Sequence, residues 1–419
     1  MKTKFSMRAR GIAWLCTLVY FASYLMRINF SVMIARICVD TGFSETELAV
    51  VLTGLTIFYG TGQIVNGFLG DRIPPNKMLT FGLCLAAACN VGMFFCTTVP
   101  LMTVVWCING FAHAMLWPPI VRLLSTYLND EEYSYAAVRV SWGSSFATIF
   151  LYLLCPVFLS FMTWRAILLS LAVIGIIIAV VWTVSFPKLF ILPKKETEEA
   201  PASPEEAPKK KKGAPLPPSV FLPVVLIFLG IVLQGMLRDG VTTWMPTLLS
   251  DSFGFDVESS IFYTVILAIF SILSFSGANF LHRKLFTNEV TCAGAIFAFS
   301  AVCTLLLILL QGSAIASILL MAIIVAGMHG INLMLITVVP KRFVKSGRVS
   351  TFSGILNAGT YVGAAIAMPA FAAIAEHFGS WSVTITVWLI VSALGALVCF
   401  VAVPMWKRFR KNYADNPDI

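Results

Sequence analysis

The sequence predicts an all-α integral membrane protein, with twelve transmembrane helices arranged in two pseudo-symmetric six-helix bundles. Three observations predict this class: 58% of the 419 residues are hydrophobic, only 12% are charged, and the apolar residues gather in twelve long runs. A soluble domain carries about 25% charged residues. This chain therefore has too little polar surface to face water on all sides. Each run reaches the roughly 20 residues that a helix needs to cross the hydrocarbon core.

The runs form two sets of six separated by a polar stretch. The first set covers residues 11–37, 47–70, 78–97, 101–127, 134–160 and 165–187, and the second covers 219–250, 258–281, 289–311, 315–340, 349–375 and 380–405. The stretch between them is rich in Pro, Ala, Glu and Lys and cannot bury a core, so we expect a flexible charged linker there. The chain then divides into an N-terminal bundle (1–187), a linker (188–218), a C-terminal bundle (219–405) and a tail (406–419).

Lysine and arginine are concentrated in alternate connections between the runs. They occur at the N-terminus, near Arg72, in the linker, near Arg283 and Arg342, and in the tail. The positive-inside rule places these connections and both termini in the cytoplasm. The net charge of +9 follows from this topology, so we expect no nucleic-acid partner. The first run has no signal cleavage site, and we expect a monomer in a bacterial inner (plasma) membrane. Two six-helix repeats predict a ligand site near the midplane, between the halves.

Two arginines interrupt equivalent runs at similar depth, Arg27 in the first and Arg238 in the seventh. An arginine at a helix centre costs about 2.5–3.5 kcal/mol on insertion scales. Because the same cost occurs at matching positions in the two halves, we expect the two arginines to serve one common function. Two guanidinium groups facing one cavity would bind an anion such as a phosphate or carboxylate through paired hydrogen bonds. The alternative is that each arginine snorkels to the interface or pairs with a helix carbonyl.

Polar neighbours lie on the same helical faces as these arginines. Tyr20, Tyr24 and Arg27 share one face, so two phenols can donate to an anion beside the arginine. An aromatic packing stripe would give the same pattern. On the seventh run, Gln234 shares a face with Arg238. Asp239, the next residue in the chain, would hold Arg238, contact sugar hydroxyls, carry a proton, or simply neutralise the arginine.

Four further polar residues lie inside apolar runs. His113 and His329 occupy the fourth and tenth runs, which are again equivalent, and are candidates for substrate or proton binding. Hydrogen-bonded structural histidines are the alternative. Gln63 and Asn332 are also candidate substrate ligands. Either residue would serve equally well to join neighbouring helices.

The loop after the second run reads Gly67-Phe-Leu-Gly-Asp71-Arg72. It resembles the G-x-L-x-D-R loop of the major facilitator superfamily, in which a tight turn and a charge pair latch helix ends on the cytoplasmic side. The resemblance implies that Asp71 and Arg72 act in gating. A solvated pair of loop charges is the alternative.

Three other stretches resemble the organophosphate:phosphate antiporters, the family that includes bacterial glycerol-3-phosphate and hexose-phosphate transporters. They are Tyr24-Leu-Met-Arg27-Ile-Asn29-Phe-Ser, Trp117-Pro118-Pro119 followed by Arg122, and Arg238-Asp239-Gly-Val-Thr-Thr-Trp244-Met-Pro246. The resemblance implies the major facilitator fold. It also implies phosphoryl binding by Arg27 and Arg238 beside Tyr20 and Tyr24. Exchange of cytoplasmic inorganic phosphate for external organophosphate would follow from rocking of the two halves.

Departures from the family pattern leave the substrate open. Gln63 stands where the family has a lysine, and Gly235 stands where it has a tyrosine. The stretch Ser141–Ser145 replaces a region that carries a histidine in the glycerol-phosphate member. Two alternatives therefore accompany organophosphate exchange. One is a cation-coupled carboxylate (hexuronate-like) symporter that uses Asp239 or a histidine, since the first motif also resembles the anion:cation symporters. The other is a membrane sugar-phosphate sensor.

No pattern in the sequence indicates an enzyme. There is no nucleotide-binding loop, no metal-ligand cluster, and no nucleophile beside a positioned base. The ten cysteines include no C-x-x-C pair and lie mostly in apolar runs, which argues against a disulfide framework. We therefore expect no metal and no cofactor.

Overall fold

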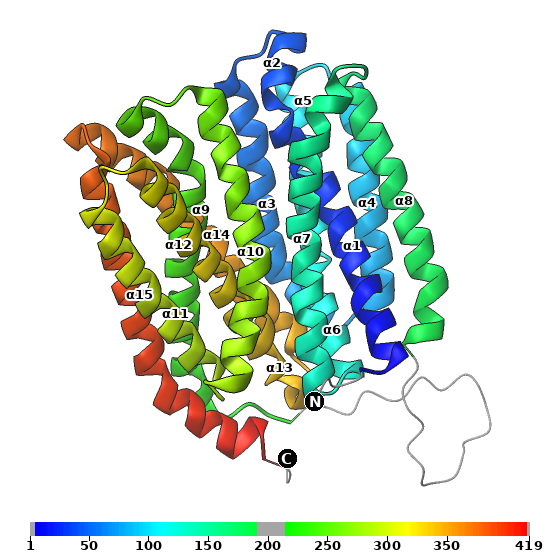
Figure 1. Cartoon of the computed structure of the whole chain (residues 1–419). Coiled ribbons are helices and arrows are strands. Elements are labelled where there is room, and N and C mark those ends of the chain that lie inside the picture. Colours follow the sequence, from blue (N-terminus) through cyan, green and yellow to red (C-terminus); the bar gives the residue numbers. More distant parts are fainter. Residues whose placement is uncertain (1–4, 191–213, 417–419) are drawn as a thin grey trace.

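The computed structural model describes residues 5–190 and 214–416. Within them, twelve helical segments are long and apolar enough to cross a membrane, which confirms the predicted fold class. Figure 1 shows two bundles side by side, with the start of α1 and the end of α15 at the same face. We call this face the terminal side and the opposite face, where α2 lies, the distal side.

The first bundle contains eight helices. They are α1 (Met7–Val32), α2 (Ile34–Thr41), α3 (Glu45–Gly70), α4 (Pro75–Phe95), α5 (Val99–Ala114), α6 (Trp117–Tyr127), α7 (Asp130–Leu159) and α8 (Trp164–Leu189). Helices α5 and α6 together make one span. The helix breaks between them, directly before Pro118 and Pro119, because proline lacks an amide hydrogen and clashes with the preceding turn.

The second bundle follows the same plan. Its helices are α9 (Phe221–Phe253), α10 (Val257–Lys284), α11 (Glu289–Leu309), α12 (Ala314–Asn332), α13 (Val339–Lys341), α14 (Val349–Phe378) and α15 (Trp381–Phe409). A π-helical turn, Leu333–Val338, joins α12 to α13 within one span. This disturbance precedes Pro340 and lies in the span equivalent to the broken α5–α6.

Two helices extend past the predicted bundle limits. Helix α8 ends at Leu189 rather than 187, and α15 continues to Phe409 rather than 405. The apolar runs stop at Lys188 and Lys407, whereas the helices do not, because basic side chains in a last turn interact favourably with the helix dipole. Residues 191–213 of the predicted linker lie outside the described residues.

The halves meet closely where α3 packs against α14. A Cβ atom at Gly354 would lie 2.1 Å from the carbonyl oxygen of Gln63, and one at Gly67 would lie 2.9 Å from that of Ser350. Glycine is required here because the two backbones are in direct contact. This contact involves the last two turns of α3 and the first two turns of α14, so it holds the halves together on the terminal side.

Polar contacts between α7 and the second bundle close the same side. The hydroxyl of Tyr133 donates to the carbonyl oxygen of Thr337 at 2.6 Å. Lys341 Nζ lies 2.5 Å from a carboxylate oxygen of Asp130. Arg283 forms an ion pair of 3.1 Å with Glu131. The first turn of α7 is thus attached to both α10 and the α12–α13 segment.

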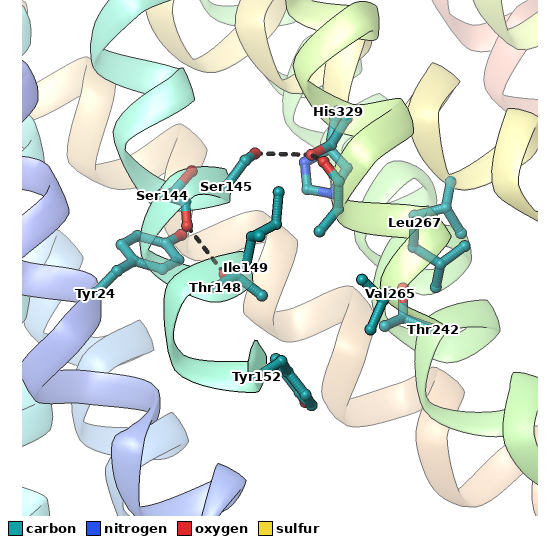
Figure 2. Close-up of a pocket in the computed structure, with 13 residues that line it drawn as sticks. Tyr24, Ser144, Ser145, Thr148, Ile149, Tyr152, Thr242, Val265, Leu267 and His329 are labelled. Atoms are coloured by element: carbon teal, nitrogen blue, oxygen red, sulfur yellow. Dashed lines mark hydrogen bonds between the residues drawn. The ribbon is translucent and has the colours of Figure 1, made fainter. Parts of the chain in front are cut away.

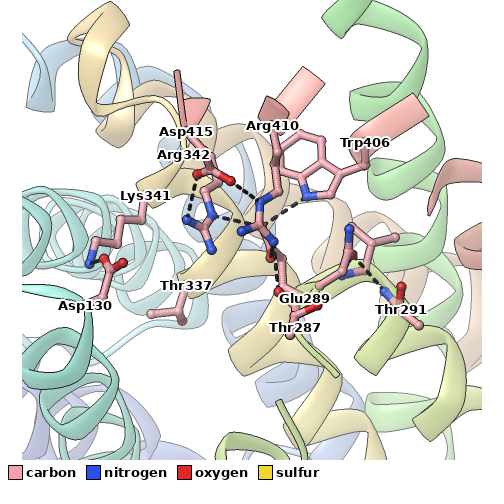
Figure 3. Close-up of polar contacts among 12 residues, drawn as sticks. Asp130, Thr287, Glu289, Thr291, Thr337, Lys341, Arg342, Trp406, Arg410 and Asp415 are labelled. Atoms are coloured by element: carbon pink, nitrogen blue, oxygen red, sulfur yellow. Dashed lines mark hydrogen bonds and ion pairs between the residues drawn. The ribbon is translucent and has the colours of Figure 1, made fainter. Parts of the chain in front are cut away.

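A buried carboxylate organises the terminal side of the second bundle (Figure 3). Glu289, at the start of α11, is fully buried and accepts from Arg342 Nε at 3.1 Å and Arg410 Nη1 at 2.9 Å. The indole of Trp406 donates to the same carboxylate at 3.0 Å. These bonds fix the end of α15 against α11 and against the segment that carries Lys341.

Candidate functional site

A small cavity of about 40 Å³ lies between the two bundles, near the middle of their helices. It is lined by four helices from each half: α1, α3, α6 and α7 on one side, and α9, α10, α12 and α14 on the other. The lining residues are Tyr20, Tyr24, Tyr59, Trp117, Ser141, Ser144, Arg238, Phe275, His329, Asn332, Asn357 and Tyr361. Because the wall comes equally from both halves, any rocking of the halves changes this cavity.

Arg27 on α1 is held between aromatic rings. Its guanidinium carbon lies 4.0 Å from the ring centre of Tyr24 and 4.6 Å from that of Tyr59. The faces of these rings attract a cation electrostatically. No acidic side chain among the described residues forms an ion pair with Arg27. Its positive charge is therefore held by aromatic rings and remains available to an anion.

Arg238 on α9 forms a paired contact with the neighbouring Asp239. The distance from Nε to Oδ1 is 2.6 Å, and that from Nη2 to Oδ2 is 2.8 Å. Both side chains are mostly buried, at 14% and 21% exposure. Tyr24, which contacts Arg27, lines the same cavity as Arg238, so the two arginines act on the same space.

The charge of the site follows from these contacts. Arg27 and Arg238 contribute two positive charges and Asp239 one negative charge, which leaves a net charge of about +1 at neutral pH. Phenol groups surround this charge: the rings of Tyr20 and Tyr24 lie 5.1 Å apart, and those of Tyr59 and Tyr361 lie 4.8 Å apart. A cationic cavity with several phenols is suited to an anion with many acceptor oxygens.

The structure brings most of the predicted ligands together. Tyr20, Tyr24, Arg238, His329 and Asn332 line the cavity. Arg27 stacks on two of the lining tyrosines, and Asp239 reaches the site through its contact with Arg238.

Three other predicted ligands lie outside the lining. His113 is buried in the first bundle, with Nδ1 at 3.0 Å from the hydroxyl of Ser23. Gln234 donates to the carbonyl oxygen of Met328 at 3.0 Å, inside the second bundle. Gln63 is fully buried on α3, where its backbone faces Gly354. His113 and Gln234 thereby join neighbouring helices, whereas both side-chain amide atoms of Gln63 are buried without a hydrogen-bond partner among the described residues.

Several lining residues were not predicted as ligands. Tyr59 comes from α3, and Asn357 and Tyr361 come from α14; no sequence motif marked these three residues. The sequence feature that could have identified them is that each is a polar side chain inside an apolar run. Trp117 was part of a recognised motif, and its ring lies 4.8 Å from that of Tyr20.

A larger chamber of about 170 Å³ continues from the cavity towards the distal side (Figure 2). Both spaces share Tyr24, Ser144 and His329. The chamber then follows α7 through Thr148 to Tyr152, which lies two turns nearer the distal end than Ser144. The central cavity thus leads to the distal side, whereas α3, α7 and α14 close the terminal side.

Asp71 lies at the terminal-side closure. Its two carboxylate oxygens accept from the backbone amides of Ser350 and Thr351, both at 2.9 Å. These amides belong to the first turn of α14, where the helix dipole favours a negative charge. Arg72 lines the same corner, together with Arg348. Asp71 therefore joins the first bundle to the second on the terminal side.

The sequence profile of the Major Facilitator Superfamily matches residues 16–353. The chain belongs to this superfamily. It is 28% identical over 296 residues to the glycerol-3-phosphate transporter of Bacillus subtilis (strain 168), a match that covers 66% of each chain. It is 29% identical over 129 residues to a probable hexose phosphate transport protein of Chlamydia trachomatis, which covers 31% of this chain and 27% of the relative. The matches thus span only part of each relative.

The solved structure of the proton:xylose symporter XylE superimposes on the whole fold. The TM-score is 0.73 at 12% identity, with 97% of both chains covered. These findings confirm the predicted family resemblance and the major facilitator fold. The chain is a multi-pass membrane protein of this superfamily, and the named relatives are transporters rather than enzymes.

Proposed function

We propose that the chain takes up an organophosphate in exchange for inorganic phosphate by alternating access. The observation that carries this proposal is the pair of arginines, one from each half, beside one tyrosine-lined cavity. In this proposal Arg27 and Arg238 bind the phosphoryl group. The names of the two relatives, which concern glycerol 3-phosphate and hexose phosphate, support a substrate of this class.

The chemistry of the cavity favours a phosphoryl group. Its oxygens can accept from a guanidinium fork and from phenol hydroxyls at the same time, which the two oxygens of a carboxylate do less completely. Arg27 has no acidic partner among the described residues, so the incoming anion supplies its counter-ion. Asp239 limits the positive charge of the empty site by pairing with Arg238.

The balance of charge in the site supports alternating access. In the empty site, two arginines from opposite halves face the same space, and their like charges oppose closure of the halves around it. A bound anion removes this repulsion. A ligand shifts a conformational equilibrium only by its differential affinity for the two states. The empty carrier is therefore expected to switch slowly, which gives exchange rather than net flux.

Counterflow in proteoliposomes loaded with inorganic phosphate tests the proposal. Labelled phosphate is added outside, and a panel of organophosphates and carboxylates competes for uptake. We expect phosphate exchange that one organophosphate inhibits. Arg27→Lys and Arg238→Lys should each weaken phosphate binding about 10- to 100-fold, because lysine cannot replace a paired guanidinium contact of about 1.5–3 kcal/mol.

Arg36→Lys is the matched control, because Arg36 pairs with Asp40 in the distal helix α2, away from the cavity lining. Intact exchange in both site variants would refute the arginine clamp. Carboxylate uptake driven by a proton or sodium gradient, without phosphate exchange, would favour a symporter and make Asp239 the next residue to change. Ligand binding without exchange would favour a sensor.

A further inference from the structure

A third arginine, Arg139 on α7, lies outside the site described above. Its guanidinium carbon is 3.5 Å from the ring centre of Tyr135 and 5.1 Å from that of Trp142. Nη1 donates to the backbone oxygen of Tyr135 at 3.3 Å. Nε is buried and has no hydrogen-bond partner among the described residues. This cation thus lies against two aromatic rings, and one of its hydrogen-bond donors has no acceptor among the described residues.

The acidic residues nearest to Arg139 along α7 are engaged elsewhere. Asp130 pairs with Lys341, and Glu131 pairs with Arg283. Glu132 accepts a hydrogen bond from Ser6 at 2.9 Å. Within the described part of the chain, Arg139 forms no ion pair. An arginine rarely lies in a transmembrane segment without a partner, so this position indicates an anionic ligand.

The face of α7 that carries Arg139 points away from the transport cavity. Phe146, Leu153 and Val157 follow at spacings that place them on the same face, and they are 40%, 55% and 54% exposed. Ser144 and Thr148, which line the cavity and its chamber, lie on the opposite face. Exposed apolar side chains on a membrane helix contact lipid, so Arg139 lies at one end of a lipid-facing stripe.

The depth of Arg139 matches that of a lipid headgroup. It lies nine residues after the start of α7, or about 13 Å along the helix axis. Helical side chains lean towards the N-terminus of their helix, and arginine snorkels further in that direction. The guanidinium is therefore directed to the terminal-side interface. Tyrosine and tryptophan concentrate at that level of a membrane.

We propose that Arg139, Tyr135 and Trp142 form a binding site for the phosphate of an anionic phospholipid. The acyl chains would lie along the stripe of Phe146, Leu153 and Val157. The apolar stripe favours a lipid over free phosphate, because only a lipid has acyl chains that can pack against it. The terminal side carries the basic connections that mark the cytoplasmic leaflet, where anionic lipids attract such residues.

The site adjoins the boundary between the two halves. The indole of Trp142 donates to the backbone oxygen of Ile272 on α10 at 3.2 Å. Figure 1 shows α7 beside α10 along this boundary. A lipid bound at Arg139 therefore contacts the elements that separate when the terminal side opens, and its presence stabilises the closed terminal side.

Native mass spectrometry of the full chain tests this inference. The protein is mixed with equal amounts of phosphatidylcholine and phosphatidylglycerol, and the retained lipids are counted. We expect the wild type to retain phosphatidylglycerol preferentially. Arg139→Gln should reduce this preference about fivefold, the effect of removing one basic residue near an anionic surface. Arg139→Lys, which keeps the charge, should retain most of it.

Arg165→Gln is the matched control. Arg165 also stacks on an aromatic ring, Trp164 at 4.2 Å, but it donates to the backbone oxygens of Phe94 and Cys96 and begins a helix on the distal side. Its substitution should leave the phosphatidylglycerol preference unchanged.

Three results would overturn the inference. The first is a wild type without preference for phosphatidylglycerol. The second is an unchanged preference in Arg139→Gln or, where that variant does not fold, in Tyr135→Leu, which removes one of the two rings. The third is displacement of phosphatidylglycerol by added inorganic phosphate, which would assign the site to soluble phosphate. Lipid retention is measured without transport, so it is independent of the proposed exchange.

Discussion

We propose that the contact of Asp71 with the start of α14 is a latch that keeps the terminal side closed, and this proposal gives a quantitative prediction. In Asp71→Asn, one side-chain oxygen remains as an acceptor, while the new amide group faces a backbone N–H that it cannot bind. The variant loses one of the two 2.9 Å bonds. A hydrogen bond to a charged group contributes about 1.5–3 kcal/mol, and a charge near a helix N-terminus about 0.3–1 kcal/mol.

A net loss of about 2 kcal/mol shifts the equilibrium towards the terminal-open state about 30-fold. A cysteine at Ser141, in an otherwise cysteine-free chain, reports this shift. Ser141 lines the central cavity and is 5% exposed, so a membrane-impermeant maleimide added from the terminal side reaches it only through an open gate. Labelling should be about 30-fold faster in Asp71→Asn than in the protein that keeps Asp71, because the labelling rate is proportional to the fraction of molecules whose terminal side is open.

Asp40→Asn is the matched control, because it removes the same charge from an ion pair in the distal helix α2. It should leave terminal-side labelling unchanged. A folded Asp71→Asn variant that is labelled at the wild-type rate would refute the assignment of Asp71 as a latch. An equal acceleration in the Asp40 variant would show a general effect of charge instead.

Three further substitutions test other contacts. Tyr133→Phe removes the hydroxyl that donates to Thr337. The loss of a hydrogen bond of about 1 kcal/mol should accelerate maleimide labelling of the Ser141 cysteine about fivefold. Unchanged labelling would show that this bond does not hold the terminal side closed. Glu289→Gln leaves Arg342 and Arg410 without their buried carboxylate. The free energy of unfolding should fall by about 3–5 kcal/mol, which lowers the midpoint of thermal unfolding. An unchanged midpoint would contradict the buried ion-pair network. Asp239→Asn keeps one acceptor oxygen, so it frees one of the two Arg238 donors and removes a negative charge from the site. Inorganic phosphate should therefore bind about tenfold more tightly in calorimetry. Weaker binding would show that Asp239 is needed to orient the arginine.

Properties that are local to one helix could be predicted from the sequence. A run of apolar residues specifies a membrane span wherever it occurs in the chain, so the twelve segments were predictable. An arginine inside such a run is costly, and the repetition of this cost at matching positions identified Arg27 and Arg238. The loop at residues 67–72 was recognised from a short motif, whereas the break before α6 was not predicted, although Pro118 and Pro119 stand at its start.

Contacts between helices were decided only by the tertiary structure. Periodicity identifies which residues of one helix share a face, but it does not identify the helix that the face meets. Packing places Tyr59 and Tyr361 at the cavity, and it buries His113 and Gln234 inside their own bundles. Arg139 also lies inside a predicted run, but the equivalent run 349–375 contains no arginine, so the repetition that marked Arg27 and Arg238 is missing for it. Whether an arginine faces a cavity or lipid depends on how the neighbouring helices pack against its own.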